Sequence, residues 1–236
     1  MIDITILASG SAGNCIFLDD GVTPLLLDAG IKFSDIQRGL EFKVSKLAGC
    51  LVTHGHLDHA RAVKNLMKAG IDCYMSKETA EALRFNGHRF RIIECYAPFE
   101  VGSWHILPFE ARHDVPCLGY LLASSKGGKV LYLTDSAYCK FRFQGLTHIL
   151  IGVNYDEEII KENVESGETD RYLKNRVAQS HMSLSTLINI LKANDLSMVK
   201  AIYLLHLSNT NLDKEEAKRR IQETTGKPVY VPRERN

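Results

Sequence analysis

The stretch LVTHGHLDHA, residues 51–60, places three histidines and an aspartate within six positions, directly after a short apolar run. These polar residues are His54, His56, Asp58 and His59, and the whole chain has only nine histidines. A polar surface turn would explain the cluster if the imidazoles faced water. A metal site is the other explanation, because zinc and similar divalent ions accept imidazole and carboxylate ligands at about 2.0–2.2 Å.

The flanking segments favour the metal site. Residues 49–53, GCLVT, indicate a short buried strand, and residues 60–70, ARAVKNLMKAG, have helical spacing with a glycine stop. The four polar residues then fill the turn after a strand, where the sheet holds the backbone while side chains can converge. Neighbours such as Asp58 and His59 point in different directions. The four groups therefore fit two adjacent metals better than one.

Composition limits the functional classes. The 236 residues are 45% hydrophobic and 24% charged, which is typical of a globular protein. A net charge of +1 argues against a uniformly basic nucleic-acid binder but leaves a local basic patch possible. The six cysteines lie singly in apolar surroundings, which predicts buried, reduced thiols. The first residues, MIDITILASG, indicate a strand rather than a signal peptide, and no run reaches the roughly 18 apolar residues of a membrane span. We expect a cytoplasmic protein.

Short strands with interspersed helices predict an α/β sandwich in which helices cover the sheets. Strands are predicted at 4–7, 15–18, 24–30, 49–53, 73–76, 104–113, 119–125, 129–135, 148–154, 201–208 and 228–231, and helices at 60–70, 77–85, 183–195 and 213–225. We expect one domain over residues 1–236. Residues 156–181 form a charged segment within it, for which no element is predicted.

The H-x-H-x-D-H pattern of residues 54–59 resembles the signature of the metallo-β-lactamase hydrolase superfamily, and further motifs of that family have counterparts here. LLLDAG supplies Asp28, ARHDVPCLGY supplies His113, VLYLTDSA supplies Asp135 and YLLHLS supplies His206. The resemblance implies a four-layer αββα sandwich. It also implies two divalent metal ions, Zn²⁺ or Mn²⁺, bridged by Asp135 and a hydroxide. One ion would be held by His54, His56 and His113, and the other by Asp58, His59 and His206. In this picture Asp28 supports the metal loop by hydrogen bonding.

Other segments resemble the WalJ/YycJ-like group, whose members are regarded as DNA exonucleases. SGSAGNC at residues 9–15 is similar to the group's SSGSSGN opening, SHMS at 180–183 to its GHLS, and LLHLSNTNLD at 204–213 to its HLSxxNN. VNYDEE and YLKNRV, at 153–158 and 172–177, also match group motifs. Two departures are Tyr155, where the group has histidine, and Ser180, where it has glycine. Because di-iron members carry glutamate at the position of His56, the resemblance implies hydrolysis rather than redox chemistry.

A two-metal phosphodiesterase that acts on DNA as an exonuclease is therefore the leading hypothesis. Its catalytic residues would be Asp58, Asp135 and His181, the last as a phosphate ligand or proton donor. The expected substrate contacts are Asn154, Arg171, Lys174, Arg176 and Asn209. RFNGHRFR at 84–91 is a second basic cluster, although such clusters are also common on solvated helix faces.

Three alternatives remain. An RNA-processing nuclease is the nearest, although only 70 residues separate Asp135 from His206, too few for the long inserted cap of RNA-cleaving relatives. A thioester, lactone or β-lactam hydrolase would favour an apolar pocket rather than the charged segment 156–181. A metal-bound scaffold without activity is disfavoured, because degenerate members lose ligands and all seven are present. The sequence leaves the metal, DNA or RNA preference, polarity of cleavage and oligomeric state open.

Overall fold

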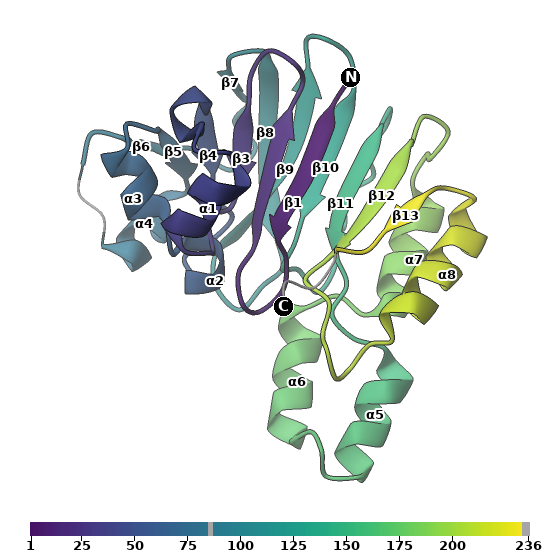
Figure 1. Cartoon of the computed structure of the whole chain (residues 1–236). Helices are drawn as coiled ribbons and strands as arrows, with labels where there is room; N and C mark the ends of the chain where they lie inside the picture. The colour runs from purple at the N-terminus through teal and green to yellow at the C-terminus, as the bar shows by residue number, and fades with distance from the viewer. Residues whose placement is uncertain (85–86, 233–236) are drawn as a thin grey trace. The chain divides into compact units, whose positions relative to one another are not determined.

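The computed structural model describes residues 1–84 and 87–232, and its strands belong to two sheets of six and seven strands (Figure 1). The chain divides into two compact units. The first comprises residues 1–110 and 115–128, and the second comprises residues 111–114 and 129–232. The charged segment 156–181 belongs to the second unit. A single domain over the whole chain stays a prediction.

The six-stranded sheet lies in the first unit, with its strands side by side in chain order. They are β1 (Asp3–Ala8), β2 (Cys15–Asp19), β3 (Leu25–Leu27), β4 (Gly49–Leu51), β5 (Cys73–Met75) and β6 (Phe90–Ile92). The first three strands pair antiparallel, and β3 to β6 pair parallel. Neighbouring parallel strands end at one edge of a sheet. The chain therefore delivers Asp28, after β3, and the 52–59 loop, after β4, to the same edge.

The other elements of the first unit are α1 (Phe33–Gly39), the 3₁₀ turn η1 (Val44–Lys46), α2 (Leu57–Ala60), α3 (Val63–Lys68), α4 (Lys77–Leu83), β7 (Phe99–Val101), β8 (Trp104–Ala111) and β9 (Cys117–Ser124). The prediction of one helix at 60–70 is wrong in its bounds. A helix begins at Leu57, so Asp58 and His59 lie in its first turn, and the chain continues as a second short helix. Five of the six cysteines are buried, as predicted, and Cys95 is half-buried.

A buried polar network in the first unit surrounds Asp20. Its carboxylate accepts hydrogen bonds from the hydroxyls of Ser103 (2.6 Å) and Ser124 (2.5 Å) and from the backbone amide of Thr23 (2.9 Å). Burial alone would raise the pKa of Asp20, but these hydrogen bonds stabilise the charged form and hold the pKa below its ordinary value. Asp20 therefore fastens β9 and the segment before β8 to the turn after β2.

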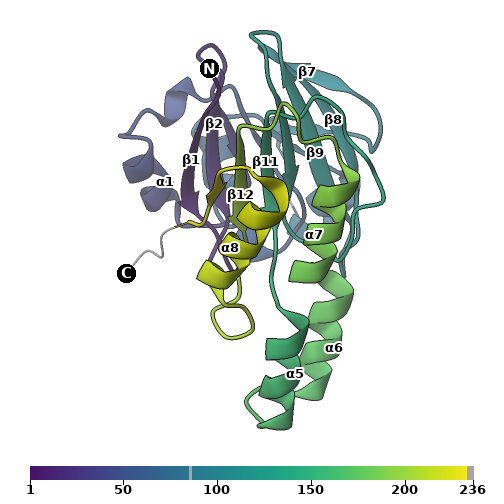
Figure 2. The ribbon, with the colours of Figure 1, turned by 90° about the vertical axis from the view of Figure 1, so that its right-hand side faces the viewer.

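In the second unit, β10 (Lys129–Leu133), β11 (His148–Gly152), β12 (Ala201–Leu205) and β13 (Val229–Tyr230) pair parallel in chain order. The helices α7 (Leu184–Ala193) and α8 (Lys214–Thr225) lie beside one another along these strands (Figure 2). The helix α7 buries Leu184, Leu187 and Leu191, the apolar stripe predicted from the sequence. The carboxyl ends of β10, β11 and β12 lead directly to Asp135, Asn154 and His206.

The charged segment folds into two helices, α5 (Glu157–Glu165) and α6 (Arg171–Ser180), for which the sequence had predicted no element. The two helices lie side by side and extend beyond the ends of β11 and β12 (Figures 1 and 2). The carboxylates of Asp156 and Asp170 cap them by accepting from the amides of Glu158 and Tyr172. No helix within residues 1–84 and 87–232 is long and apolar enough to cross a membrane.

Candidate metal centre

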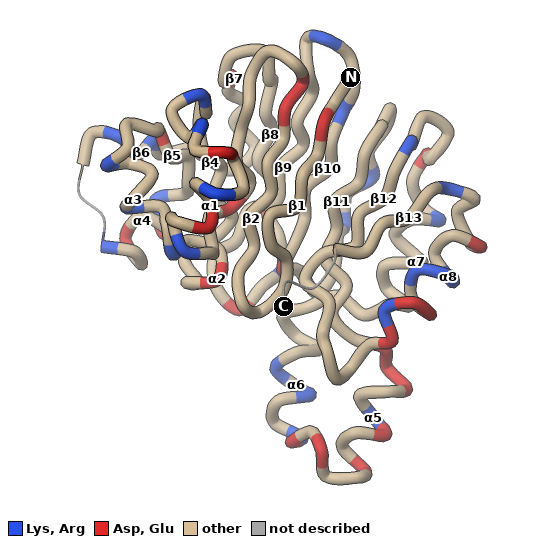
Figure 3. Tube along the Cα trace, viewed as in Figure 1, with Lys and Arg blue, Asp and Glu red and all other residues tan. Residues whose placement is uncertain are grey.

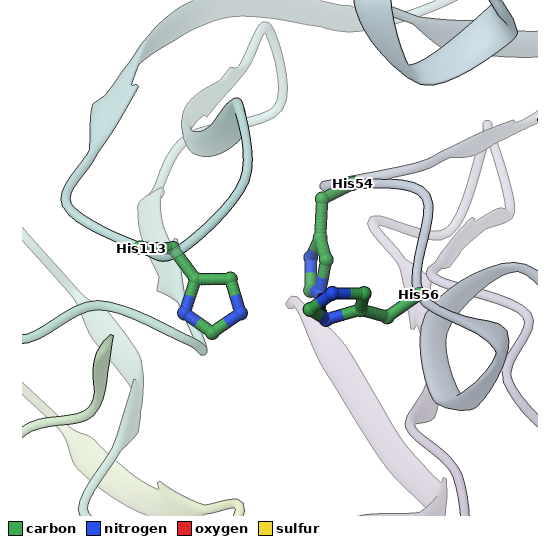
Figure 4. Close-up of side chains that lie close together, drawn as sticks. All are labelled: His54, His56 and His113. Carbon is green, nitrogen blue, oxygen red and sulfur yellow. Dashed lines mark hydrogen bonds between the residues drawn. The ribbon is translucent and has the colours of Figure 1, made fainter. Parts of the chain in front are cut away.

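The first unit gathers the four polar residues of the 54–59 stretch. His54 and His59 are buried, and the Nε2 atom of His54 lies 3.0 Å from Nδ1 of His56. The rings of His54 and His56 meet edge to face (Figure 4). Asp58 Oδ2 lies 3.6 Å from His59 Nε2. The structure therefore brings together every ligand candidate that the opening stretch supplied.

Asp28 supports this cluster, as the resemblance implied. Its buried carboxylate pairs with Nδ1 of His59 at 2.7 Å and accepts from the backbone amide of Thr53 at 2.8 Å. A carboxylate at Nδ1 favours the tautomer in which Nε2 carries the lone pair that binds metals. Asp28 thereby orients His59 and ties the metal loop to the end of β3.

The glycine-rich loop before β2 also brackets the metal loop, a role that the sequence analysis did not assign. The backbone amide of Asn14 donates to the carbonyl of Asp58 at 2.7 Å, and its side-chain Nδ2 lies 3.0 Å from Nε2 of His59. Gly30 closes the bracket by donating to the carbonyl of Asn14 at 2.8 Å. A Cβ atom on Gly30 would lie 1.6 Å from the carbonyl oxygen of Asp58, so only glycine fits. The glycines and asparagine of SGSAGNC were the available signal.

The second unit gathers His113, Asp135, His181 and His206 around one carboxylate. Oδ2 of Asp135 lies 3.7 Å from Nε2 of His113, 3.5 Å from that of His181 and 3.7 Å from that of His206. The ring of His181 meets His113 edge to face and stacks on His206, with both pairs of centroids 5.2 Å apart. His181, predicted only from a family motif, therefore lies within the cluster.

Backbone and amide groups orient these histidines. Nδ1 of His113 donates to the carbonyl of Ser180 at 2.8 Å, and the side-chain amide of Asn154 donates to the carbonyl of His206 at 3.0 Å. Burial lowers the pKa of His113, although the carboxylate of Asp135 opposes this. The neutral imidazole that results is the form that binds a metal. Asn154, predicted as a substrate contact, therefore also supports His206.

Ser180, one of the two departures from the group pattern, orients His181. Its hydroxyl donates to the carbonyl of Arg176 at 2.7 Å and lies 2.8 Å from Nδ1 of His181. Because the hydroxyl proton is already donated, the oxygen accepts from Nδ1–H, and Nε2 faces Asp135. Neutral His181 then offers a lone pair at Nε2, and it can donate a proton there only as an imidazolium. Tyr155, the other departure, is buried, and its backbone pairs with that of Ser183 in an isolated β-bridge.

The donor atoms fit divalent metals. Two ligands bound at about 2.1 Å to a tetrahedral ion lie about 3.4 Å apart. The separations within the first cluster are 3.0 and 3.6 Å, and those around Asp135 are 3.5 to 3.7 Å. In the second unit, ligand atoms of His113, Asp135 and His181 all lie within 4.8 Å of one another. Each unit therefore presents imidazole and carboxylate groups at the spacing that a metal requires.

The predicted substrate contacts other than Asn154 lie outside the two clusters. Arg171 and Arg176 are exposed on α6 and Lys174 is half-buried there, whereas exposed Asn209 accepts a hydrogen bond from Lys214 at 2.7 Å. In the second basic cluster, Arg89 and Arg91 both pair with Asp72, which offsets their charge. Residues 85–86 of that cluster lie outside the described residues.

Residues 23–207 match the family model described as the Beta-lactamase superfamily domain. The chain belongs to this superfamily. Two relatives are the exodeoxyribonucleases WalJ of Streptococcus pneumoniae serotype 2 and YycJ of Bacillus anthracis. WalJ is 30% identical over 90% of this chain and 84% of its own length, and YycJ is 25% identical over 92% and 86%. The metallo-β-lactamase fold protein YhfI of Bacillus subtilis superposes with a TM-score of 0.73 at 15% identity, covering 98% of this chain and 97% of its own.

The superfamily assignment confirms the predicted α/β fold of the metallo-β-lactamase type. It also confirms that the chain is a metal-dependent hydrolase. The resemblance to the WalJ/YycJ-like group is confirmed by the two relatives of that name.

Proposed function

We propose that this superfamily member is a two-metal phosphodiesterase that degrades DNA from an end. The similarity to WalJ over 90% of the chain carries the proposal, because the relative's name states that activity. The donor spacing around Asp135 and within the 54–59 loop supports it. We also propose a cytoplasmic setting, where such a substrate is available.

The proposed ligand set combines both clusters and follows the family pattern. By this pattern, His54, His56 and His113 would hold one ion and Asp58, His59 and His206 would hold the other, and the carboxylate of Asp135 would serve both. Zn²⁺ and Mn²⁺ both suit histidine and carboxylate donors. When bound, two such ions supply a nucleophile from water at neutral pH and stabilise the attacking and leaving oxygens.

The protein side chains contribute orientation and proton transfer. Asp58 and Asp135 supply carboxylates that orient an attacking water through hydrogen bonds. His181 contacts the phosphate or, in its protonated form, donates a proton from Nε2 to the departing 3′ oxygen. Ser180 holds its ring in that orientation. Asn154, beside His206, and Asn209 are the proposed neutral contacts to substrate.

DNA is favoured over RNA by the names of the relatives. Arg171, Lys174 and Arg176 would contact phosphates, which position a nucleic acid without reading its bases. Degradation should therefore tolerate many sequences, weaken as salt rises and stop when a chelator removes the metals. RNA-processing activity is the alternative for the same residues.

The test combines metal analysis with assays on end-labelled DNA and RNA, single- and double-stranded. We expect two metal ions per chain after reconstitution with Zn²⁺ or Mn²⁺, and shortening of DNA from one end. One ion or fewer would contradict the dinuclear centre. Hydrolysis of a thioester or lactone, without cleavage of any DNA or RNA, would contradict the nuclease.

A charge variant tests the phosphate contacts. Replacing Arg171, Lys174 and Arg176 together by alanine should reduce the slope of log affinity against log salt by about 2, at roughly 0.7 for each lost contact to a single strand. The matched control removes three exposed cations of the first unit, Lys46, Lys64 and Lys68. Metal content should stay unchanged in both variants. Equal slopes in the two variants would contradict the assignment.

A further inference from the structure

The helix α6 carries the most exposed aromatic side chain that the structure describes. Tyr172, in its first turn, has 78% of its surface exposed, and its neighbour Leu173 has 43%. A ring this exposed offers a stacking surface, and burial of its apolar area against a ligand is favourable. Its backbone amide is held by Asp170, so the ring stands on a capped and ordered helix end.

The exposure pattern divides α6 into two faces. Lys174, Val177 and Ser180, spaced three apart, are half-buried or buried and form the inner stripe. Tyr172 and Arg176, four residues apart, are both exposed and are neighbours on the outer face. The ring and a guanidinium therefore share one solvent-facing ridge.

Charge on the two helices is separated. The helix α6 contains three basic residues and no acidic one, whereas most acidic residues of the segment lie on α5 and the connecting turn (Figure 3). Segment 156–181 as a whole has seven acidic residues against four basic ones. In the described part of the chain, no salt bridge joins Arg171 or Arg176 to a carboxylate. Their charge is available to a ligand.

This distribution of charge favours a nucleic acid with one phosphate backbone over a duplex with two. A single strand lying along α6 meets the guanidinium groups and the tyrosine ring and avoids the carboxylates of α5. A duplex carries a second phosphate backbone, which the α5 carboxylates would repel. Bases of a single strand also expose their faces, and stacking on an aromatic side chain contributes about 1–3 kcal/mol per base.

The carboxyl end of α6 enters the metal cluster. The carbonyl of Ser180 holds Nδ1 of His113, and the next residue, His181, lies 3.5 Å from Asp135. Ser180 lies eight positions after Tyr172 on the helix, which corresponds to a rise of about 12 Å. At about 3.4 Å per stacked nucleotide, this spans three to four nucleotides.

We propose that the outer face of α6 is a single-strand track, in which Tyr172 stacks on a base three to four nucleotides from the cleaved bond and Arg176 contacts a phosphate nearer to that bond. This inference rests on the proposed nuclease function and adds a substrate class to it. The enzyme would act on single-stranded DNA or on a frayed end, and it would handle short fragments poorly.

The experiment measures binding and cleavage separately. Binding is followed by fluorescence anisotropy of a labelled twelve-nucleotide single strand in the presence of a chelator, and cleavage is followed on the same strand with metal. Tyr172→Ala should weaken binding and raise KM by about 5- to 150-fold, from the stacking energy of one base. Tyr172→Phe keeps a ring and should bind as the unmodified protein does. Tyr230→Ala, at another exposed tyrosine, is the matched control.

Further measurements exclude a structural effect. Hydrolysis of bis(p-nitrophenyl) phosphate, which is too short to reach Tyr172, should be unchanged in Tyr172→Ala, as should metal content and melting temperature. Binding of a blunt duplex should change much less than binding of the single strand. Equal losses on both DNA forms would overturn the stacking assignment.

The outcomes separate this inference from the proposed function. If the protein degrades DNA and Tyr172→Ala binds and cleaves single strands normally, the track is wrong and the nuclease stands. The exposed ring would then be a surface for a protein partner. If Tyr172→Ala loses single-strand binding but no nucleic acid is cleaved under any metal, the track stands and the nuclease fails.

Discussion

Replacement of Asp28 by asparagine tests how the metal loop is held. Asparagine keeps the size of the side chain and tolerates the left-handed backbone of Asp28, whose φ is +57°. It can still accept from the amide of Thr53. Its amide group would, however, face Nδ1 of His59, where the carboxylate now lies at 2.7 Å. The variant therefore loses one charge-assisted hydrogen bond and adds a conflict between two donors.

The loss has a definite magnitude. A hydrogen bond to a charged group contributes about 1.5–3 kcal/mol, and a buried donor without an acceptor adds about 1 kcal/mol or more. We expect the free energy of unfolding to fall by about 2–4 kcal/mol, which for a chain of this length lowers the melting temperature by about 4–16 °C. Loss of the group that orients a metal-binding histidine typically weakens metal affinity 10- to 100-fold.

Calorimetry gives the melting temperature, and competition with a chromogenic chelator gives the metal affinity. Asp72→Asn is the control, because Asp72 also pairs with two cations, Arg89 and Arg91, but these are substantially exposed. Surface pairs contribute about 0–1 kcal/mol, so the control should melt within a few degrees of the unmodified protein and bind metal normally. An Asp28→Asn protein with unchanged melting temperature and metal affinity would refute the supporting role of the carboxylate.

Three further predictions concern Asp135, His181 and Asp20. Asp135→Ala should lower kcat/KM about tenfold more than His113→Ala, because the proposed bridge serves both ions and His113 serves one; equal losses with both metals retained would contradict the bridge. His181→Ala should lower turnover by about 10²- to 10⁴-fold with metal content unchanged, as expected for a general acid, and loss of a metal in elemental analysis would instead make His181 a ligand. The hydrogen bonds to Asp20 lower its pKa in the folded state, so its contribution to stability is complete above its unfolded value of about 3.9 and is lost as the pH falls below it. Urea unfolding should therefore show a difference between the unmodified protein and Asp20→Asn that shrinks between about pH 5 and pH 3, whereas a constant difference would exclude the linkage.

The residues of the two clusters could be predicted from the sequence because their chemistry and their positions coincide. Asp28, Asp135 and His206 each follow a short apolar run, and the three runs are strands of parallel ladders. Parallel strands end at a common edge, so a polar residue after each run is a strong signal. The spacing of the 54–59 loop added the pattern that identifies the superfamily.

Apart from Asp28, the supporting residues could not be predicted in the same way. Asn14 meets His59 across 45 positions of sequence, and Ser180 meets His113 across 67. Such contacts depend on how the loops fold after the strands have paired, and the periodicity of the sequence does not indicate them. Gly30 is an example, because its need for a missing Cβ arises only from the approach of Asp58.

The helices α5 and α6 were missed because the prediction relied on apolar periodicity. Each helix has one fully buried side chain, Ile160 and Ser180 respectively, so neither has the apolar stripe of α7. Their helical signals are local instead. Asp156 and Asp170 are N-caps, and Lys161 with Glu165 forms a pair four residues apart. A prediction that considers N-cap residues and charge pairs as well as apolar periodicity would identify both helices.

Backbone strain links the two clusters to the fold. Asp28 and His206 both have left-handed backbones, with φ of +57° and +50°, and each lies directly after a parallel strand. A non-glycine residue in this conformation costs of order 1 kcal/mol or more, and surrounding contacts must hold it. Asp28 is held by Thr53 and His59, and His206 is held by Asn154. Without the left-handed residue, the extended strand would continue, and each side chain would lie on a face of the sheet instead of at its edge. Glycine at either position would relieve the backbone strain, but it would also remove the side chain that the turn positions. The strain is therefore retained because the proposed metal centre needs these side chains.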